Sequence, residues 1–570
     1  IFTVPTAMPV AEKRIFRRWV LWAVRVVWQA LGWEQWYLPP GRNRGQGGDY
    51  RFSPQVRCDW DEASCSQLVL LYNELAVKQH GDAHHLFRLM GRPRAAHGGR
   101  PCVRVASIDI GGGTTDLSIT TYELASGEGD TARIVPHTEF RDGFNIAGDE
   151  VLREVVANHV IPAISEALVK QGLAEPRALL GQLFGRDAIG MSQEERNTRV
   201  RLVRQIAVPV ALGLLAACEA PDQQEVSRTC RLADFFEPAP LPPEAMSSVP
   251  NSANGDEHTV QGTAPAFRAP RPQPGILRAV EALVRRACPS IERFDVLDVP
   301  ITVRPQAIDA TIRATLGPAL SALCEIVHLY DSDVLLLTGR PSAWRGVIAP
   351  VLAKLPVPPD RILPMRQYHV GGWYPFADAL GRITDPKTTV VVGAILCALA
   401  DGHLEGFSFD SGALHLKSTA RYIGEMDING QLRRPKVWFT VDVDSKEGSE
   451  QLRQVAFSGP LSIGYRQLDA ERWPTTRYHL LTFTSEEART RASGRLPSQV
   501  DIRLRVDDVW DDAPRNEDDK ERRSEGEFSI DAIVDAQGRG VDRRDLEIRL
   551  QTLKLDEGYW LDTGIVTDAG

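Results

Sequence analysis

The chain has 570 residues, more than one hydrophobic core usually supports, so its length predicts two or more domains. Hydrophobic residues make up 43% and charged residues 25% of the sequence, as in ordinary globular proteins, and the formal charge of -9 is small for this length. This charge balance gives no sign of a nucleic-acid partner, and we expect none.

The cysteine pattern and the first residue bear on the compartment of the protein. The eight cysteines form no C-x-x-C pair and no cluster with histidine, so we expect reduced thiols and a cytoplasmic protein. The sequence begins at Ile1, inside a strand-like run, which we interpret as a fragment truncated at its N-terminus. Secretion stays open as an alternative, because a signal peptide would precede this residue.

Residues 1–104 are the first expected domain. Their most apolar stretch, 19–33, is short and carries Arg25 at its centre, so we expect no transmembrane segment. Helical spacing of apolar residues predicts an amphipathic helix packed on a domain, with a basic membrane-surface helix as the alternative. The residues at this spacing are Ile15, Trp19, Trp22 and Val26. A second helix is predicted over residues 62–77.

A glycine-rich hairpin is the strongest chemical signal. Two apolar strands are predicted over residues 103–110 and 115–122, and only glycine lets a hairpin between them bring backbone N–H groups close to phosphate oxygens. The acids Asp109 and Asp116 flank the turn, so that both can face the phosphates from neighbouring strands and hold Mg²⁺. Thr114 can add a hydroxyl donor. The pattern therefore predicts a phosphate- and magnesium-binding hairpin rather than a plain turn.

Helices and one insertion follow in the second expected domain, residues 105–300. Acids in the first turn favour a helix that begins near residue 148, and further helices are predicted over 193–219 and 276–288. Residues 237–275 are rich in Pro, Ala, Ser and Asn and have almost no large aliphatic side chains. We interpret this stretch as a disordered insertion.

The remaining sequence divides into two zones. Residues 301–405 contain a helix, a buried-type strand at 334–338, a turn, and a closing helix of small residues at 390–400. Residues 406–570 show short alternating runs that predict a β-rich C-terminal domain. The highly charged stretch 507–527 is most simply a solvated loop within it.

Other polar candidates are weaker. The adjacent histidines His84 and His85 lack a third ligand, so a solvated loop is expected there rather than a metal site. Ser107 and Ser118 have no accompanying His and Asp pattern that would support a hydrolase.

The run D-I-G-G-G-T-T-D at 109–116 resembles the second phosphate motif of the actin and DnaK superfamily of ATPases. Five further segments resemble that superfamily in the same order. They are residues 2–7 (I-T-V-P-A segment), 61–64 (N-E-P-T), 148–150 (G-G-E-D), 334–339 (adenosine motif) and 389–394 (closing helix). The resemblance implies an α/β actin-like ATPase fold of duplicated ribonuclease H-like lobes. Residues 1–104 would then be the remainder of the first lobe, 105–300 and 301–405 the second.

A narrower resemblance is to the bacterial virulence factor SrfB family. It rests on V-P-T-A-M-P at 4–9, T-G-R-P-S at 338–342 and Y-H-V-G-G-W-Y-P at 368–375. This family resemblance implies a link to bacterial virulence but no particular reaction.

The superfamily resemblance also implies roles for individual residues. Asp109 and Asp116 would hold the metal, and the hairpin would cradle the phosphates of ATP through Gly111, Gly112, Gly113, Thr114 and Thr115. Glu62 would act with Asp109 in catalysis by positioning the attacking water, although an acid at a helix N-terminus is also favoured by the helix dipole alone.

Base contacts would come from Gly339 and Arg340. Arg340 and Pro341 replace a glycine and a small hydroxyl residue typical of the chaperones, so Arg340 can either stack on adenine or block the approach. The first phosphate hairpin of the superfamily would lie before Ile1.

Three functions are consistent with these motifs. The first is a slow ATP-dependent conformational switch, with ATP or ADP and Mg²⁺ as ligands and an unidentified protein partner bound through the β-rich C-terminal domain. The second is a degenerate scaffold that binds partner proteins without hydrolysis. The third is a small-molecule kinase of the same superfamily, whose catalytic acid would lie in the missing N-terminal lobe.

Overall fold

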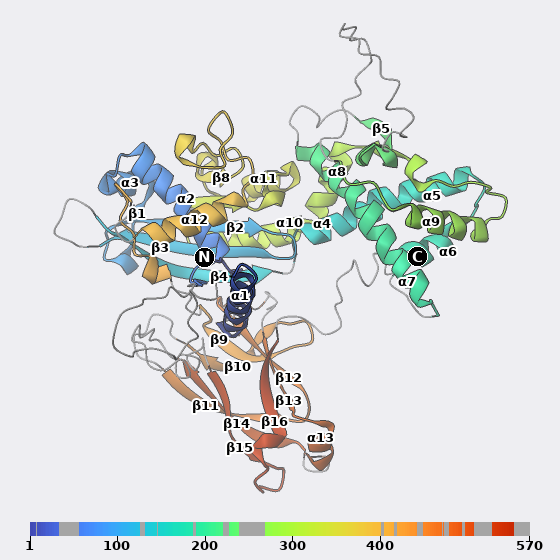
Figure 1. The fold of residues 1–570 in the computed structure, drawn as a ribbon. Helices are drawn as coiled ribbons and strands as arrows, with labels where there is room; N and C mark the ends of the chain where they lie inside the picture. The colour runs from blue at the N-terminus through green and yellow to red at the C-terminus, as the bar shows by residue number, and fades with distance from the viewer. Residues whose placement is uncertain are drawn as a thin grey trace. The chain divides into compact units, whose positions relative to one another are not determined.

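A computed structural model provides the structure of the chain (Figure 1). It describes residues 1–6, 8, 10–32, 56–125, 132–144, 146–185, 190–219, 227–238, 268–400, 404–414, 419–441, 449–469, 471, 478–492, 496–506 and 527–551. Residues 239–267 of the Pro-rich insertion and 507–526 of the charged stretch therefore lie outside the described residues.

The chain divides into two compact units. Unit 1 comprises Ile1–Asn145, Glu325–Arg340 and Pro356–Lys554, and unit 2 comprises Ile146–Cys324, Pro341–Leu355 and Leu555–Gly570.

A mixed sheet lies at the centre of unit 1, with strand order β4-β3-β2-β7-β8 and β1 paired to β2 at the side. The neighbours β4, β3 and β2 run antiparallel, whereas β7 and β8 continue the sheet in parallel with β2. The three strands predicted at 103–110, 115–122 and 334–338 are confirmed. The sheet strands are β1 (Arg92–Pro93), β2 (Pro101–Ile110), β3 (Thr115–Leu124), β4 (Ile134–Phe144), β7 (Val334–Thr338) and β8 (Ile362–Pro364).

Helices α2 (Glu62–Tyr72) and α12 (Thr388–Leu399) pack against each other and share one core with this sheet. Residues 63–71 of α2 are all buried, which fits a helix covered on more than one side. The helices cross very closely, because a Cβ added to Gly393 would lie 1.9 Å from the carbonyl oxygen of Cys65. Val103 and Val105 of β2 point into this core, so the alternation of a strand places Asp109 on the same face.

Helix α2 continues as the π-helical segment η2 (Asn73–Lys78), and α3 (Ala83–Met90) follows. The predicted helix over 62–77 is thus confirmed. The solvated loop expected at His84 and His85 is wrong, since both residues lie in the first turn of α3, where Asp82 accepts a hydrogen bond from the His85 backbone. Both histidine side chains are exposed, as an amphipathic helix allows for residues beside a buried stripe.

Helix α1 (Val10–Ala30) forms, but the face expected to pack on a domain is exposed. Trp19 is 66% and Trp22 is 55% exposed, and Ile15 and Val26 are exposed as well. A different stripe contacts the small core of Val4, Val56 and Cys58, and it consists of Phe16, Val20, Leu21 and Val24. Both stripes are apolar and both have helical spacing, so periodicity alone favoured the wrong one.

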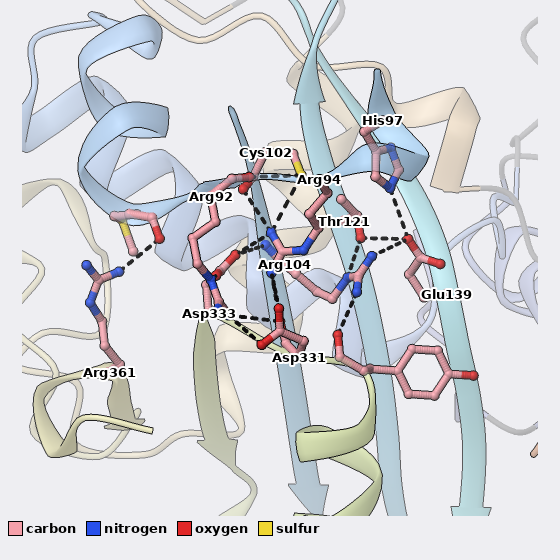
Figure 2. Close-up of polar contacts among 12 residues, drawn as sticks. Arg92, Arg94, His97, Cys102, Arg104, Thr121, Glu139, Asp331, Asp333 and Arg361 are labelled. Carbon is pink, nitrogen blue, oxygen red and sulfur yellow. Dashed lines mark hydrogen bonds and ion pairs between the residues drawn. The ribbon is translucent and has the colours of Figure 1, made fainter. Parts of the chain in front are cut away.

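A buried ion-pair cluster joins β1, β2 and the entry to β7 (Figure 2). Asp333, whose side chain is 3% exposed, accepts from Arg92 Nε at 2.6 Å and from Arg94 Nη1 at 2.8 Å. It also exchanges two backbone contacts with Arg104: its Oδ2 accepts from the Arg104 N–H, and its own N–H donates to the Arg104 carbonyl, both at 2.8 Å. Asp331 lies at the rim of the cluster with a 65% exposed side chain. The cluster fixes where β7 enters the sheet.

The C-terminal part of unit 1 is β-rich. A five-stranded sheet, β10-β9-β12-β13-β16, and a three-stranded sheet, β11-β14-β15, are both antiparallel and contribute to one hydrophobic core. The short alternating runs of this region, for example residues 437–440 and 479–483, fall in β10 and β13. The elements are β9 (Tyr422–Met426), β10 (Leu432–Thr440), β11 (Ser449–Phe457), β12 (Leu461–Arg466), β13 (Tyr478–Phe483), α13 (Glu486–Ala492), β14 (Ser498–Val506), β15 (Glu527–Val534) and β16 (Leu546–Gln551).

Unit 2 is mainly helical, with one small sheet of β5 and β6. Its first helix begins at residue 148 as predicted, and the Glu150 carboxylate accepts from the Ala147 backbone N–H at 2.9 Å. The elements are α4 (Gly148–Val155), η4 (Val156–Val160), α5 (Ile161–Lys170), α6 (Arg177–Phe184), α7 (Gln193–Leu202), η5 (Val203–Ala207), α8 (Val208–Glu219), β5 (Arg228–Arg231), α9 (Pro274–Ala287), β6 (Pro300–Val303), α10 (Pro305–Leu329, shared with unit 1) and α11 (Arg345–Lys354).

Two helical stretches, Gln193–Glu219 and Pro305–Leu329, are long and apolar enough to cross a membrane by length and composition. Their most apolar windows are 56% and 39% buried within the structure. Core helices of water-soluble proteins meet the same criterion, so these two stretches are weak evidence for a span. The expected absence of a transmembrane segment stays a prediction.

Candidate functional site

The glycine hairpin joins β2 to β3 in unit 1. Asp109 lies opposite Asp116 and Ile110 opposite Thr115, and the Gly111 N–H donates to the Thr114 carbonyl at 2.8 Å to close the turn. Gly112, Gly113 and Thr114 are exposed, whereas Thr115 is buried at the start of β3. The tip of the hairpin is therefore open to a ligand while its base is fixed in the sheet.

The two acids at the base of the hairpin are buried, and most of their carboxylate oxygens lack a hydrogen-bond donor among the described residues. Asp109 is 2% and Asp116 is 4% exposed. Among the described residues, no group donates a hydrogen bond to either carboxylate oxygen of Asp109 or to Oδ1 of Asp116. Buried polar atoms normally have partners, because an unpaired buried carboxylate is costly. The pair is thus the kind of oxygen-ligand set that suits a hard divalent cation or its bound waters.

The pKa values of Asp109 and Asp116 also show that their charged forms are unfavourable in this environment. Burial raises the pKa of Asp109 to about 6, Lys387 lowers it, and Glu62 and Asp61 raise it further. Burial raises the pKa of Asp116 well above its usual range, helped most by the neighbouring charge of Asp109. The site therefore favours a bound cation at neutral pH.

Asp61 and Glu62 begin α2 beside these acids. Asp61 caps the helix by accepting from the Ser64 N–H at 2.9 Å, and it accepts from the hydroxyls of Ser64 at 2.7 Å and Thr6 at 3.1 Å. Arg141 Nη2 of β4 lies 3.1 Å from Asp61 Oδ2, and both side chains are buried. In contrast to Asp109, Asp61 has hydrogen-bond donors at both of its carboxylate oxygens, which makes it a structural anchor for Thr6.

Glu62, the predicted water-positioning acid, forms an ion pair with Lys387, whose Nζ lies 2.7 Å from Oε2. Lys387 immediately precedes α12 and also interacts electrostatically with Asp109 and Asp116. Burial lowers the pKa of its ammonium, but these acids and Glu62 outweigh burial and raise it. The single positive charge of Lys387 thus partly offsets the negative charge of the acids around the hairpin. The contact leaves both interpretations of Glu62 open, since a held acid can position water or can simply favour the helix N-terminus.

The Gly339 turn lies directly against the hairpin. Strand β7 pairs in parallel with β2, with Thr338 beside Asp109, and Gly339 follows with a φ of 78°. A Cβ at Gly339 would lie 2.1 Å from the Ile110 carbonyl oxygen and 2.6 Å from Asp109 Oδ1. Only glycine fits this approach. Arg340 comes next as an exposed residue at the edge of the turn.

The structure thus brings Asp109, Asp116, the Gly111–Thr115 hairpin and Gly339 together, with Glu62 within electrostatic range. Sequence reasoning missed Lys387 and Arg141, the two cations that balance the acids. No spacing pattern connects either residue to the hairpin, because the sheet and the α2–α12 contact bring them there. A basic residue immediately before the closing helix was the only available signal for Lys387.

A pH dependence follows from the pKa of Asp109. In the folded protein Asp109 holds its proton up to about pH 6, whereas its ordinary pKa is 3.8. The folded state therefore binds more protons in this window, and the unfolding free energy falls as pH rises through it, by up to about 3 kcal/mol. Urea titrations between pH 4 and pH 7 without divalent cations will show this fall in the wild type. The neutral Asp109→Asn variant will show a smaller fall, because only Asp116, whose pKa is also raised by burial, still contributes at the hairpin. Parallel pH profiles of the two proteins would contradict the assignment.

Residues 1–567 match the family described as virulence factor SrfB. The match spans the glycine hairpin, unit 2 and the β-rich region. No match to a curated protein was found. The family description names neither a ligand nor a reaction.

Proposed function

Since the chain belongs to the virulence factor SrfB family, we propose that it works in virulence as a nucleotide-dependent switch that binds Mg²⁺ and ATP at the glycine hairpin. The observation that carries the proposal is the pair of buried carboxylates, Asp109 and Asp116, which find no hydrogen-bond donor in the described part of the chain at three of their four oxygens. Evolution of a stable fold alone gives no reason to bury two such acids beside an exposed glycine turn.

The proposed fold is the actin-like ATPase fold. Its support is the mixed sheet of unit 1, in which an antiparallel set carries the hairpin and the parallel strand β7 brings the Gly339 turn beside it. The ordered motif matches from residue 2 to residue 394 give independent support.

The residues divide into simple roles under this proposal. Asp109 and Asp116 would hold Mg²⁺ and its waters, and the exposed N–H groups of Gly112, Gly113 and Thr114 would bind phosphate oxygens. The metal ion would supply charge neutralisation, the main need of phosphoryl transfer. Glu62, held by Lys387, would position water, and slow hydrolysis would release the constraint on the hairpin and the Gly339 turn.

Calorimetry of the full chain with ATP and Mg²⁺ tests the proposal. Asp109→Asn preserves the shape of the side chain and removes its charge, so we expect at least a tenfold weaker affinity for the metal–nucleotide complex. The matched control is Asp360→Asn, because the Asp360 side chain is 79% exposed in the short turn before β8 and its loss should leave the affinity unchanged.

Three outcomes would count against the proposal. No binding by the wild type would favour the degenerate scaffold, for which Arg340 beside Gly339 is the structural support. Equal affinity of Asp109→Asn and the wild type would mean that the nucleotide does not bind at the hairpin. Binding without phosphate release, unless a small-molecule acceptor is added, would favour the kinase over the switch.

A further inference from the structure

Three side chains that can ligate a metal ion meet at the far end of strand β3 from the glycine hairpin. His97 ends the short helix η3 (Ala95–His97), Glu123 lies near the end of β3, and His137 lies on β4. One ligand atom from each residue can be chosen so that all three lie within 4.8 Å of one another. The cluster is therefore built from three separate segments of the chain.

The distances within the cluster suit a small divalent ion. His97 Nδ1 lies 3.4 Å from Glu123 Oε2, and His137 Nε2 lies 2.8 Å from Glu123 Oε1. Zinc bonds of about 2.1 Å in tetrahedral geometry place neighbouring ligand atoms roughly 3.4 Å apart. The two imidazole rings face the same carboxylate, with ring centroids 5.4 Å apart. Small side-chain adjustments would bring all three atoms to one ion.

A second layer of contacts orients His97 (Figure 2). Its Nε2 lies 3.4 Å from Glu139 Oε1, and since a carboxylate only accepts, Nε2 carries the proton in this contact. Nδ1 is then the nitrogen directed at Glu123. Glu139 is itself fixed, because it accepts from Thr121 Oγ1 at 2.7 Å and from Arg104 Nη2 at 3.2 Å. A carboxylate that holds the second nitrogen of a histidine is typical of metal-binding histidines.

The sheet explains why the cluster forms. Thr121 of β3 lies opposite His137 of β4, and alternation along each strand puts Thr121 with Glu123 on the face that also carries His137. The segment that contains η3 leads into β2, which places His97 over the same pair of strands. Neighbouring charge is limited: Arg100 Nη2 lies 3.8 Å from Glu123 Oε2, and Arg100 is half exposed, so its competition for the carboxylate is weak.

We propose that His97, Glu123 and His137 form a site for a divalent transition-metal ion, with Zn²⁺ as the representative of its class. Two imidazoles and one carboxylate are the ligand set of known three-ligand zinc sites, in which water occupies the fourth position. The ion joins the η3 segment to β3 and β4, so it stabilises this end of the sheet. The site takes nitrogen ligands and is distinct from the all-oxygen pair Asp109 and Asp116, which suits Mg²⁺.

Titration of the full chain with Co²⁺ and Zn²⁺ tests the inference, without nucleotide and in excess Mg²⁺. We expect one Co²⁺ per chain, visible d–d absorption of a low-coordinate ion, and displacement by Zn²⁺. His137→Gln removes a ligand from a 43% exposed position where the fold tolerates change, and should weaken binding at least a hundredfold. Glu139→Gln leaves all three proposed ligands in place and alters the contact that orients His97, together with the Thr121 and Arg104 contacts to the same carboxylate, and it should weaken binding about 10- to 100-fold.

The controls separate this site from other metal ligands. His84→Gln removes an exposed histidine of α3 and should leave the affinity unchanged. Thiolate ligation by the cysteines would appear as intense near-ultraviolet charge-transfer bands and would overturn the assignment. Equal Co²⁺ affinity of His137→Gln and wild type, or no saturable binding by the wild type, would leave only a His–Glu hydrogen-bond cluster and overturn it as well.

Discussion

Replacing Asp333 with asparagine should destabilise unit 1 by about 3–5 kcal/mol, the usual cost of removing one partner from a buried ion pair. The carboxylate of Asp333 receives donors from Arg92, Arg94 and the Arg104 backbone, and the Arg94 side chain is only 9% exposed. An asparagine side chain offers one acceptor oxygen, so its NH₂ group would face an arginine donor in the interior. Urea unfolding followed by tryptophan fluorescence measures the loss, because Trp60 is buried in the same unit.

The neighbouring Asp331 provides a matched control. Its Oδ1 lies 3.0 Å from Arg92 Nη2 and its Oδ2 lies 3.9 Å from Arg94 Nη2. Because the Asp331 side chain is 65% exposed, water screens both ion pairs. Asp331→Asn should cost no more than about 1 kcal/mol. Asparagine also suits the φ of 51° at this position. Equal losses in the two variants would mean that burial does not determine the strength of this cluster.

Much of unit 1 could be predicted from local sequence. Strand β7 is a nearly continuous apolar run, β2 is largely apolar, and β3 carries apolar residues such as Leu117 and Ile119 at alternate positions. A turn of three glycines between β2 and β3 leaves only a tight hairpin as the connection. Asp109 and Asp116 had to face each other once that hairpin was assigned, since the register follows from the turn. Local pattern was sufficient here because the interacting residues are close along the chain.

Features that depend on distant segments could not be predicted. The buried stripe of α1 was missed because two apolar stripes compete, and only the small core of Val4, Val56 and Cys58 distinguishes them. Lys387 reaches Glu62 because α12 packs on α2, which no periodicity in either helix indicates. The same holds for His97, Glu123 and His137, whose spacing matches no metal-binding motif. Each case needs the tertiary contact before the chemistry becomes visible.

The hairpin site is closely packed, and the burial of its two acids costs free energy. Gly339 passes so close to the Ile110 carbonyl and the Asp109 carboxylate that a side chain at this position would overlap both, so the turn and the hairpin are tightly packed. Asp109 and Asp116 nevertheless lose solvation that no described donor replaces. A bound cation would compensate for the lost solvation, so the unfolding free energy of unit 1 should rise as the cation binds. Such coupling is what a ligand-dependent switch requires.

The second large effect is expected at the crossing of α2 and α12. A Cβ at Gly393 would lie 1.9 Å from the Cys65 carbonyl oxygen and 2.4 Å from its carbon, so Gly393→Ala must push the two helices apart. Because the added methyl group would meet backbone atoms, we expect a cost near the upper end of the usual range for overpacking, about 3 kcal/mol. Gly317→Ala in α10 is the control, because nothing lies within 4 Å of its added Cβ and alanine favours a helix. Urea unfolding should therefore show that the same substitution lowers the unfolding free energy at Gly393 and raises it at Gly317. A neutral Gly393→Ala would mean that the α2–α12 contact yields at little cost, and Lys387, at the start of α12, would then be a poor anchor for Glu62.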